Sequence, residues 1–109
     1  MCSQPEYLAV LVTCPAERAA EIARVLVEQR LAACVNIIPG LRSIYSWKGQ
    51  TCDDAESLLL IKTRASLFEA LRARVGELHP SEVPEVIALP VQAGHAAYLR
   101  WVCESTGEC

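Results

Sequence analysis

The sequence predicts an α+β fold of the ferredoxin-like kind: a βαββαβ sandwich, with helices on one face of an antiparallel sheet, and an additional C-terminal helix. Three observations predict it. Four apolar, partly β-branched runs have the length of strands, two apolar stripes recur at helical spacing between them, and a Pro-Gly pair interrupts the second run without ending it. A chain of 109 residues is expected to form a single domain, residues 1–109, around one core.

The first strand and the first helix are predicted near the start of the chain. A near-continuous apolar run over residues 6–14 is typical of a strand that is buried on at least one face. Pro15 then begins a helix, with Glu17 in its first turn and Arg30 in its last turn, where the helix dipole favours each charge. Apolar residues recur every three or four positions, which predicts that one face packs on the sheet: Ala19, Ile22, Ala23 and Leu26.

The second strand is predicted to bend and then continue. Residues 33–38 are apolar, and Pro39-Gly40 follows them. A proline removes one hydrogen-bond donor from the ladder and usually marks a bend or an edge. Beyond it the chain alternates, with three large apolar side chains on one side: Leu41, Tyr45 and Trp47.

A hairpin and a second helix are predicted next. Gly49 and the aspartates after it predict a hairpin loop over residues 48–54, and residues 56–63 form the third strand. The pattern of Ser66 followed three residues later by Glu69 is that of a capping box at the start of a helix.

The last third of the chain is predicted to hold one strand and one helix. The second helix ends at His79-Pro80, because proline cannot continue it. Residues 84–91 predict the fourth strand. Gly94 precedes the short final helix, which carries Tyr98, Trp101 and Val102.

The composition argues for a self-associating protein in the cytoplasm. The chain is 52% hydrophobic and only 6% aromatic, so its aliphatic content exceeds what one small domain readily buries. The formal net charge is −3 and no basic run is present, which argues against a nucleic-acid partner. No apolar segment approaches the ~20 residues that cross a bilayer. The first residues lack the basic start of a secretory signal, so we expect no membrane partner and a cytoplasmic location.

The six cysteines are predicted to be reduced thiols. Small disulfide-rich scaffolds are poor in aliphatic residues, whereas this chain is rich in them. No Cys-x-x-Cys pair is present, which lowers the expectation of a structural zinc site or a redox centre. Cys34 is expected in the core, and Cys2 and Cys109 near the ends of the chain.

Several short motifs together resemble the CutA family of divalent-cation tolerance proteins. Among them are Glu-Gln-Arg-Leu-Ala-Ala-Cys-Val-Asn at 28–36 and His-Pro at 79–80; the others lie at 38–40, 43–45, 47–49, 61–63, 84–91 and 98–101. They follow the family order over nearly the whole chain. The resemblance implies a homotrimer of ferredoxin-like subunits, similar in architecture to the PII signalling proteins. It also implies that partner chains cover the bent arm over residues 41–51, removing an exposed edge strand.

The resemblance implies copper or another divalent cation as a ligand. Family ligands lie at the histidine before the His-Pro proline, which is His79 here, and at a cysteine near the end of the first strand, where Cys14 is the candidate. An imidazole with a thiolate or carboxylate suits copper, and Glu82 and Glu85 are close to His79 in sequence. A histidine at a helix end is also typical of a C-cap, so a structural role stays open.

Further residues of the family pattern are predicted to line the cleft between subunits: Leu41, Tyr45, Trp47, Lys62, Glu85 and Trp101. Aromatic residues in an oligomer serve as interface packing more often than as a ligand cage. Two functions therefore stay open. One is divalent-cation tolerance with metal binding, and the other is a PII-like trimer that senses a small ligand or anchors a protein, without a physiological metal.

An enzyme and an RNA-binding protein are the rejected alternatives. Cys14 or Cys34 with His79 would supply a nucleophile and a base. However, the sequence has no orienting Asn or Asp at a recognisable spacing, no phosphate-binding loop and no nucleophile elbow. RNA-recognition domains of this fold stack bases on aromatics in the central strands, where this chain has aliphatic residues. We predict a non-enzymatic protein.

Overall fold

The computed structural model describes residues 6–107 and 109. In chain order its elements are β1 (Tyr7–Cys14), α1 (Ala16–Glu28), β2 (Cys34–Trp47), β3 (Gln50–Arg64), the 3-10 turn η1 (Ala65–Leu67), α2 (Phe68–Leu78), β4 (Val86–Pro90) and α3 (Ala96–Ser105). This order confirms the α+β, ferredoxin-like prediction with its additional C-terminal helix.

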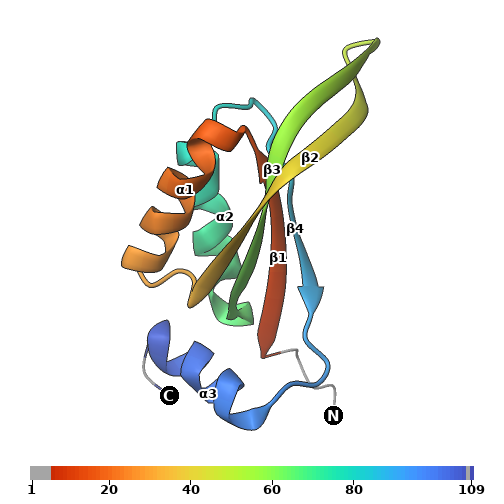
Figure 1. Cartoon of the computed structure of the whole chain (residues 1–109). Coiled ribbons are helices and arrows are strands. Elements are labelled where there is room, and N and C mark those ends of the chain that lie inside the picture. Colours follow the sequence, from red (N-terminus) through yellow and green to blue (C-terminus); the bar gives the residue numbers. More distant parts are fainter. Residues whose placement is uncertain (1–5, 108) are drawn as a thin grey trace.

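The four strands form one antiparallel sheet in the order β2-β3-β1-β4, so β1 and β3 are central. Both α1 and α2 lie on the same face of this sheet (Figure 1). The hairpin of β2 and β3 extends beyond the body at one end, and α3 lies at the opposite end. The extension leaves the arm without a neighbouring strand from its own chain.

The core lies between the sheet and the two helices. Alternate residues of β1 and β3 face the helices and are fully buried, including Val10, Val12, Leu59 and Ile61. Ile22 and Leu26 of α1 and Leu71 and Val75 of α2 meet them. The predicted apolar stripe of the first helix is therefore confirmed as its buried face.

The bent second strand is confirmed. β2 runs unbroken from Cys34 to Trp47, with an irregular register between Ile38 and Leu41. Gly40 has a φ of 81° at this point, a conformation that glycine adopts without strain. The predicted hairpin loop over residues 48–54 is wrong, because the turn contains only two residues.

Trp47 pairs directly with Gln50, so Lys48 and Gly49 alone make the turn, both with positive φ. Such two-residue turns match the twist of antiparallel strands. The aspartates that were expected in the loop lie in β3 instead. Side chains of β2 hold them there: Arg42 forms a salt bridge to Asp53, and the Tyr45 hydroxyl donates to Asp54.

The two predicted helix-terminus features are also wrong. α1 ends at Glu28, and Arg30 lies beyond it with a φ of 61°, donating to the carbonyl oxygens of Glu104 and Ser105 at the end of α3. Ser66 does not cap α2. It lies inside the 3-10 turn by which the chain leaves β3, and the N-cap, Leu67, makes no side-chain hydrogen bond.

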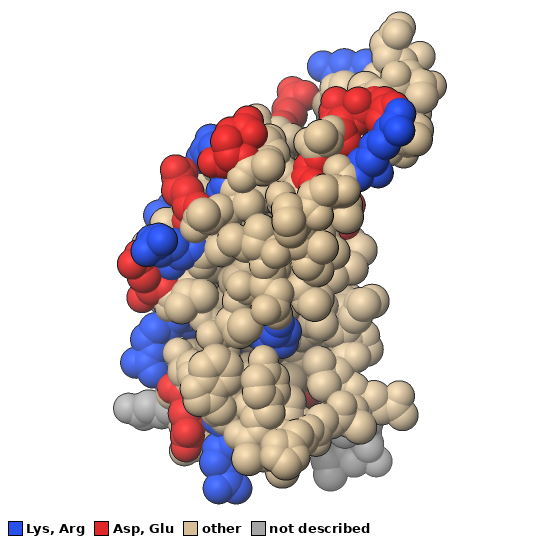
Figure 2. All heavy atoms as spheres, in the orientation of Figure 1, with Lys and Arg blue, Asp and Glu red and all other residues tan. Residues whose placement is uncertain are grey.

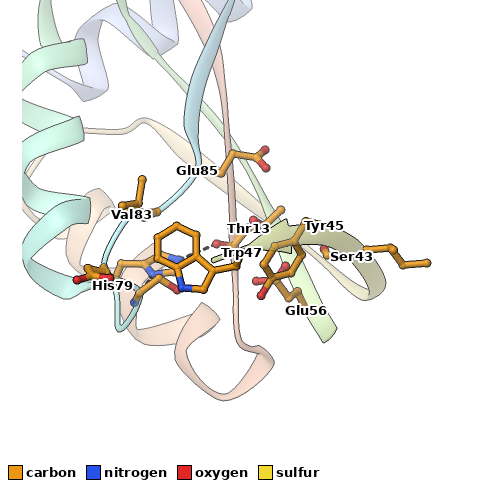
Figure 3. Close-up of a pocket in the computed structure, with 12 residues that line it drawn as sticks. Thr13, Ser43, Tyr45, Trp47, Glu56, His79, Val83 and Glu85 are labelled. Carbon is orange, nitrogen blue, oxygen red and sulfur yellow. Dashed lines mark hydrogen bonds between the residues drawn. The ribbon is translucent and has the colours of Figure 1, made fainter. Parts of the chain in front are cut away.

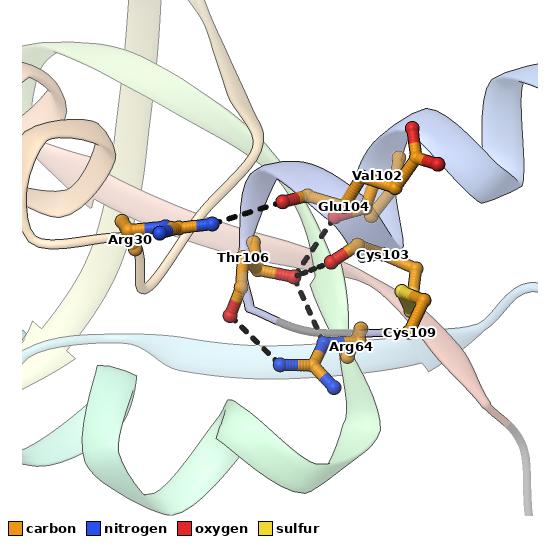
Figure 4. The surroundings of a disulfide bond; sticks show 7 residues. All are labelled: Arg30, Arg64, Val102, Cys103, Glu104, Thr106 and Cys109. Atoms are coloured by element: carbon orange, nitrogen blue, oxygen red, sulfur yellow. Dashed lines mark hydrogen bonds between the residues drawn. A yellow bond between two sulfur atoms is a disulfide. The ribbon is translucent and has the colours of Figure 1, made fainter.

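The cysteine prediction needs one correction, because Cys103 and Cys109 form a disulfide (Figure 4). After α3 the chain turns back at Gly107, which brings the two Cα atoms to 6.0 Å. Arg64 holds this turn by donating to the hydroxyl and the carbonyl oxygen of Thr106. Cys14, Cys34 and Cys52 are free thiols as predicted, and Cys2 lies outside the described residues. The expected core position of Cys34 is also wrong, because the strand register places it beside Lys62 on the sheet face away from α1 and α2, where it is only partly buried.

Candidate functional site

The sheet face opposite α1 and α2 carries no helix of its own over most of its area, and it is apolar. The strand register places Cys34, Lys62, Ala9 and Leu89 in one row across it, and Asn36, Leu60, Leu11 and Ile87 in the next. Ile87 and Leu89 are 50% and 52% exposed. Figure 2 shows charged side chains gathered over the helices and the arm, with a broad area between them that carries almost none.

We call the surface made by these two rows the open face. Within the rows, Lys62 carries the single formal charge. Its ammonium donates to the side-chain oxygen of Asn36 and, at 3.5 Å, to the carbonyl oxygen of Leu60. The thiol of Cys34 also points to the Asn36 oxygen, at 3.9 Å.

A groove of about 630 Å³ lies at the base of the arm, between the hairpin and the loop that joins α2 to β4 (Figure 3). The arm contributes Tyr45 and Trp47, and the loop contributes Glu82 and Glu85. His79 and Thr13 lie at its floor. The structure thus brings the predicted metal ligands His79, Glu82 and Glu85 into one groove with the predicted cleft residues Tyr45 and Trp47.

His79 is buried, and hydrogen bonds occupy both of its ring nitrogens. Nδ1 accepts from the backbone N–H of Ser81 at 3.0 Å, so the proton of the neutral ring lies on Nε2. Nε2 donates it to the carbonyl oxygen of Thr13 at 2.7 Å. The ring therefore ties the end of α2 to the end of β1, and neither ring nitrogen is free to bind a metal in this arrangement.

Cys14 faces the opposite side of the sheet from the groove. Its side chain is fully buried in the core beneath the helices. Burial, with a smaller contribution from Glu56, raises the pKa of its thiol above the ordinary 9.0. Within residues 6–107 and 109, no three His, Cys, Asp or Glu side chains come close enough to hold a metal ion.

The remaining predicted cleft residues are distributed over the molecule. Leu41 and Lys62 are half-buried, on the arm and on the open face. Trp101 is 45% exposed on α3, where its ring lies 5.6 Å from that of Tyr98. A second cavity of about 210 Å³ lies between α3 and the end of the sheet, and Lys62 and Tyr98 line it together with aliphatic side chains of both elements.

Charges on the arm are paired within the hairpin or with the loop. The hydrogen bond to Asp54 raises the pKa of Tyr45 to about 12. The Arg42 guanidinium lowers the pKa of Asp53. Lys48 lies 3.8 Å from Glu82 across the groove. Sequence reasoning missed Asp54, Glu56 and Thr13 as site residues, since their places depend on the register of the hairpin and on the contact of β1 with α2.

No helix of the described chain combines the length and the apolar character required to cross a membrane.

Comparison with known proteins gives consistent matches over most of the chain. Residues 8–105 match the family described as CutA1 divalent ion tolerance protein. The divalent-cation tolerance protein CutA of Thermus thermophilus is 54% identical over 99 residues, 90% of this chain and 96% of that protein. The human protein CutA is 57% identical, but the chain spans only 55% of its length.

Solved structures agree with the sequence matches. A PII-like protein CutA from Nostoc superposes with a TM-score of 0.87 at 40% identity, covering 92% of this chain and 97% of that one. A divalent cation tolerance protein CutA from Archaeoglobus fulgidus, described as periplasmic, gives a TM-score of 0.89 at 33% identity, with 93% and 99% coverage.

Proposed function

The chain belongs to the CutA1 divalent ion tolerance family, and from this premise we propose that it acts as a homotrimer in the tolerance of divalent cations. The family's description names a tolerance and no catalytic activity, and we propose a non-enzymatic role. We place this role in the cytoplasm, with neither nucleic acid nor membrane as partner. Cell fractionation tests the location, and recovery with the periplasmic fraction would contradict it.

The exposed apolar surface of the open face is the main observation that supports a trimer. Its apolar side chains include Ile87 and Leu89, each about half exposed in the single chain. Burying such a side chain fully contributes about 1.5–3 kcal/mol, so leaving several of them wet is costly. Three copies that cover one another's open faces and arms remove this cost, and they also cover the unpaired edges of the arm.

Analytical ultracentrifugation of the full chain tests the assembly. We expect a trimer, and we expect Trp47→Asp or Tyr45→Asp to lower its stability strongly, because the assembly would then bury a carboxylate without a partner. Val27→Asp is the matched control, since Val27 is 41% exposed near the end of α1, in the helix layer on the other side of the sheet from the open face. A folded single chain at nanomolar concentration, or a normal trimer in both arm variants, would contradict the proposal.

We propose copper or another divalent cation as the bound metal. The candidate ligands are His79, Glu82 and Glu85, with Cys14 as a further one. The residues as arranged do not fit a preformed site, because both His79 nitrogens are engaged and the Cys14 thiol is buried on the other face. Binding through His79 would require the ring to release Ser81 or Thr13.

Calorimetry with Cu(II) tests the metal proposal. We expect His79→Ala to weaken binding, and we expect Glu69→Ala, which removes a carboxylate from the exposed first turn of α2, to leave it unchanged. Unchanged affinity in His79→Ala would exclude His79 as a ligand.

A second function is a PII-like trimer that senses a small ligand or anchors a protein, without a physiological metal. The groove at the base of the arm favours it, because a volume of about 630 Å³ suits a small molecule. Calorimetry against a panel of small metabolites tests this alternative. Binding that Trp47→Ala abolishes would support it, and the absence of any binding would argue against it.

A further inference from the structure

Lys62 is an isolated cation in an apolar surface. Its strand neighbours on the open face are Cys34 and Ala9, and the row continues to Leu89. Among the described residues it makes no salt bridge, although the chain contains 13 aspartate and glutamate residues. An assembly that covers the open face would therefore bury an ammonium group with no counter-charge from its own face.

The Asn36 side chain that Lys62 contacts has donors to spare and no free acceptor. An ammonium group has three donors, and two of them are used, toward Asn36 and Leu60. Because the lysine can only donate, the Asn36 atom that faces it is the carbonyl oxygen, which also receives the Cys34 thiol. The Asn36 amide nitrogen, with two donors of its own, makes no hydrogen bond within the described residues.

Buried charges in proteins are paired or hydrogen-bonded, because desolvation of an isolated ion is unfavourable. A lysine ammonium and an asparagine amide side by side, without a carboxylate, provide positive charge and directed donors. A small oxyanion, a carboxylate or a phosphate, satisfies both at once through charge-assisted hydrogen bonds. A metal cation is repelled by the same groups.

We propose that Lys62 and Asn36, with Cys34 beside them, form an oxyanion-binding site that the assembled protein requires in order to cover its open face. This inference rests on the proposed homotrimer and adds the ligand class that the trimer takes at this face. The site lies on β2 and β3, within the body of the sheet and not on the arm. It is separate from the groove that contains His79.

Calorimetry of the full chain with inorganic phosphate, and separately with acetate, tests the site. We expect the trimer to bind at least one of them, and we expect Lys62→Met to weaken that binding by about tenfold to a hundredfold, the loss of one charge-assisted hydrogen bond. Lys48→Met is the matched control: Lys48 is the only other lysine of the chain, and its side chain is 73% exposed.

Thermal melts at equal ionic strength supply a second readout. Phosphate or acetate should raise the melting temperature of the wild-type trimer relative to chloride by more than that of Lys62→Met, because ligand binding stabilises the state that binds. In chloride alone, Lys62→Met should melt above the wild type, since it no longer buries an unpaired charge.

Three results would contradict the oxyanion site. If both anions bind the wild type and Lys62→Met alike, or if neither binds a trimeric wild type, the inference is wrong. It is also wrong if Lys62→Met melts below the wild type in every buffer, which would mean that a partner subunit's carboxylate pairs with Lys62. A single chain in ultracentrifugation would overturn the homotrimer together with this inference, whereas a trimer that ignores both anions overturns the inference alone.

Discussion

The two faces of the sheet are made from the same strands and yet differ in what covers them. Val10 and Val12 are completely buried beneath α1 and α2, whereas Ile87 and Leu89 on the open face are 50% and 52% exposed. Both sets are aliphatic. The difference shows that the described chain supplies cover for only one of two apolar faces, and the proposed homotrimer would cover the second.

The largest expected effect belongs to the covered face. Leu59→Ala should lower the free energy of unfolding by about 2–5 kcal/mol, because it leaves a cavity beneath fully buried neighbours. Urea unfolding measures the loss, which should be the same at every protein concentration. A loss that grows on dilution would show that Leu59 belongs to the assembly rather than to the core of each chain.

Leu89→Asp tests the open face, and here the loss of stability should depend on protein concentration. The carboxylate would be buried only when copies associate, so the variant should sediment as a smaller species and its melting temperature should fall on dilution. Leu89→Ile keeps the apolar area and is the control. A variant that sediments like the wild type would mean that the open face stays wet in the native protein.

Two free thiols report on the faces without any substitution. Cys14 is buried under the helices and Cys34 lies on the open face. Iodoacetamide should label Cys34 when the assembly is diluted, and should label Cys14 only when the chain unfolds, with mass spectrometry to locate the modified residue. Equal labelling rates would contradict the proposed difference between the faces.

Because the pKa of Cys14 is raised, the stability of the face covered by α1 and α2 depends on pH. Burial holds the thiol protonated, so its contribution to stability is complete below about pH 9 and is lost as pH rises through the higher pKa of the folded state. Labelling of Cys14 should accordingly remain slow at pH 8.

The smallest effect concerns the arm, where charges are exposed. Tyr45 has its pKa raised from 10.0 to about 12, mainly by the hydrogen bond to Asp54. This bond contributes to stability below pH 10, and the contribution is lost as pH rises through about 12. In Asp54→Asn, absorbance titration should find a Tyr45 pKa closer to 10. Asp53→Asn, which removes the partner of Arg42 instead, should leave it near 12.

Contacts that join distant segments could not be predicted from the sequence. Arg30, for example, caps α3 rather than its own helix, and lies 74 positions away from Glu104. The Cys103–Cys109 disulfide joins residues only six positions apart, but it depends on the turn at Gly107. The hairpin loop was predicted too long because the aspartates after Gly49 are typical turn residues. Cross-strand partners for Asp53 and Asp54 outweighed that local preference.

For the candidate site, sequence reasoning named residues but not their partners. His79 was expected at a helix end, and the structure places it there as the residue after Leu78. That both of its nitrogens are engaged follows from the position of Thr13, which is 66 residues away. The isolation of Lys62 likewise follows from the register that places Ala9 and Cys34 beside it.

By itself the sequence determined the number, the kind and the order of the helices and strands, as well as the bend at Gly40, because periodicity and turn chemistry act over a few residues. The tertiary structure decided which apolar face stays uncovered and which polar groups meet. Those outcomes depend on strand register and on packing between segments that lie far apart along the chain, and no local pattern encodes them.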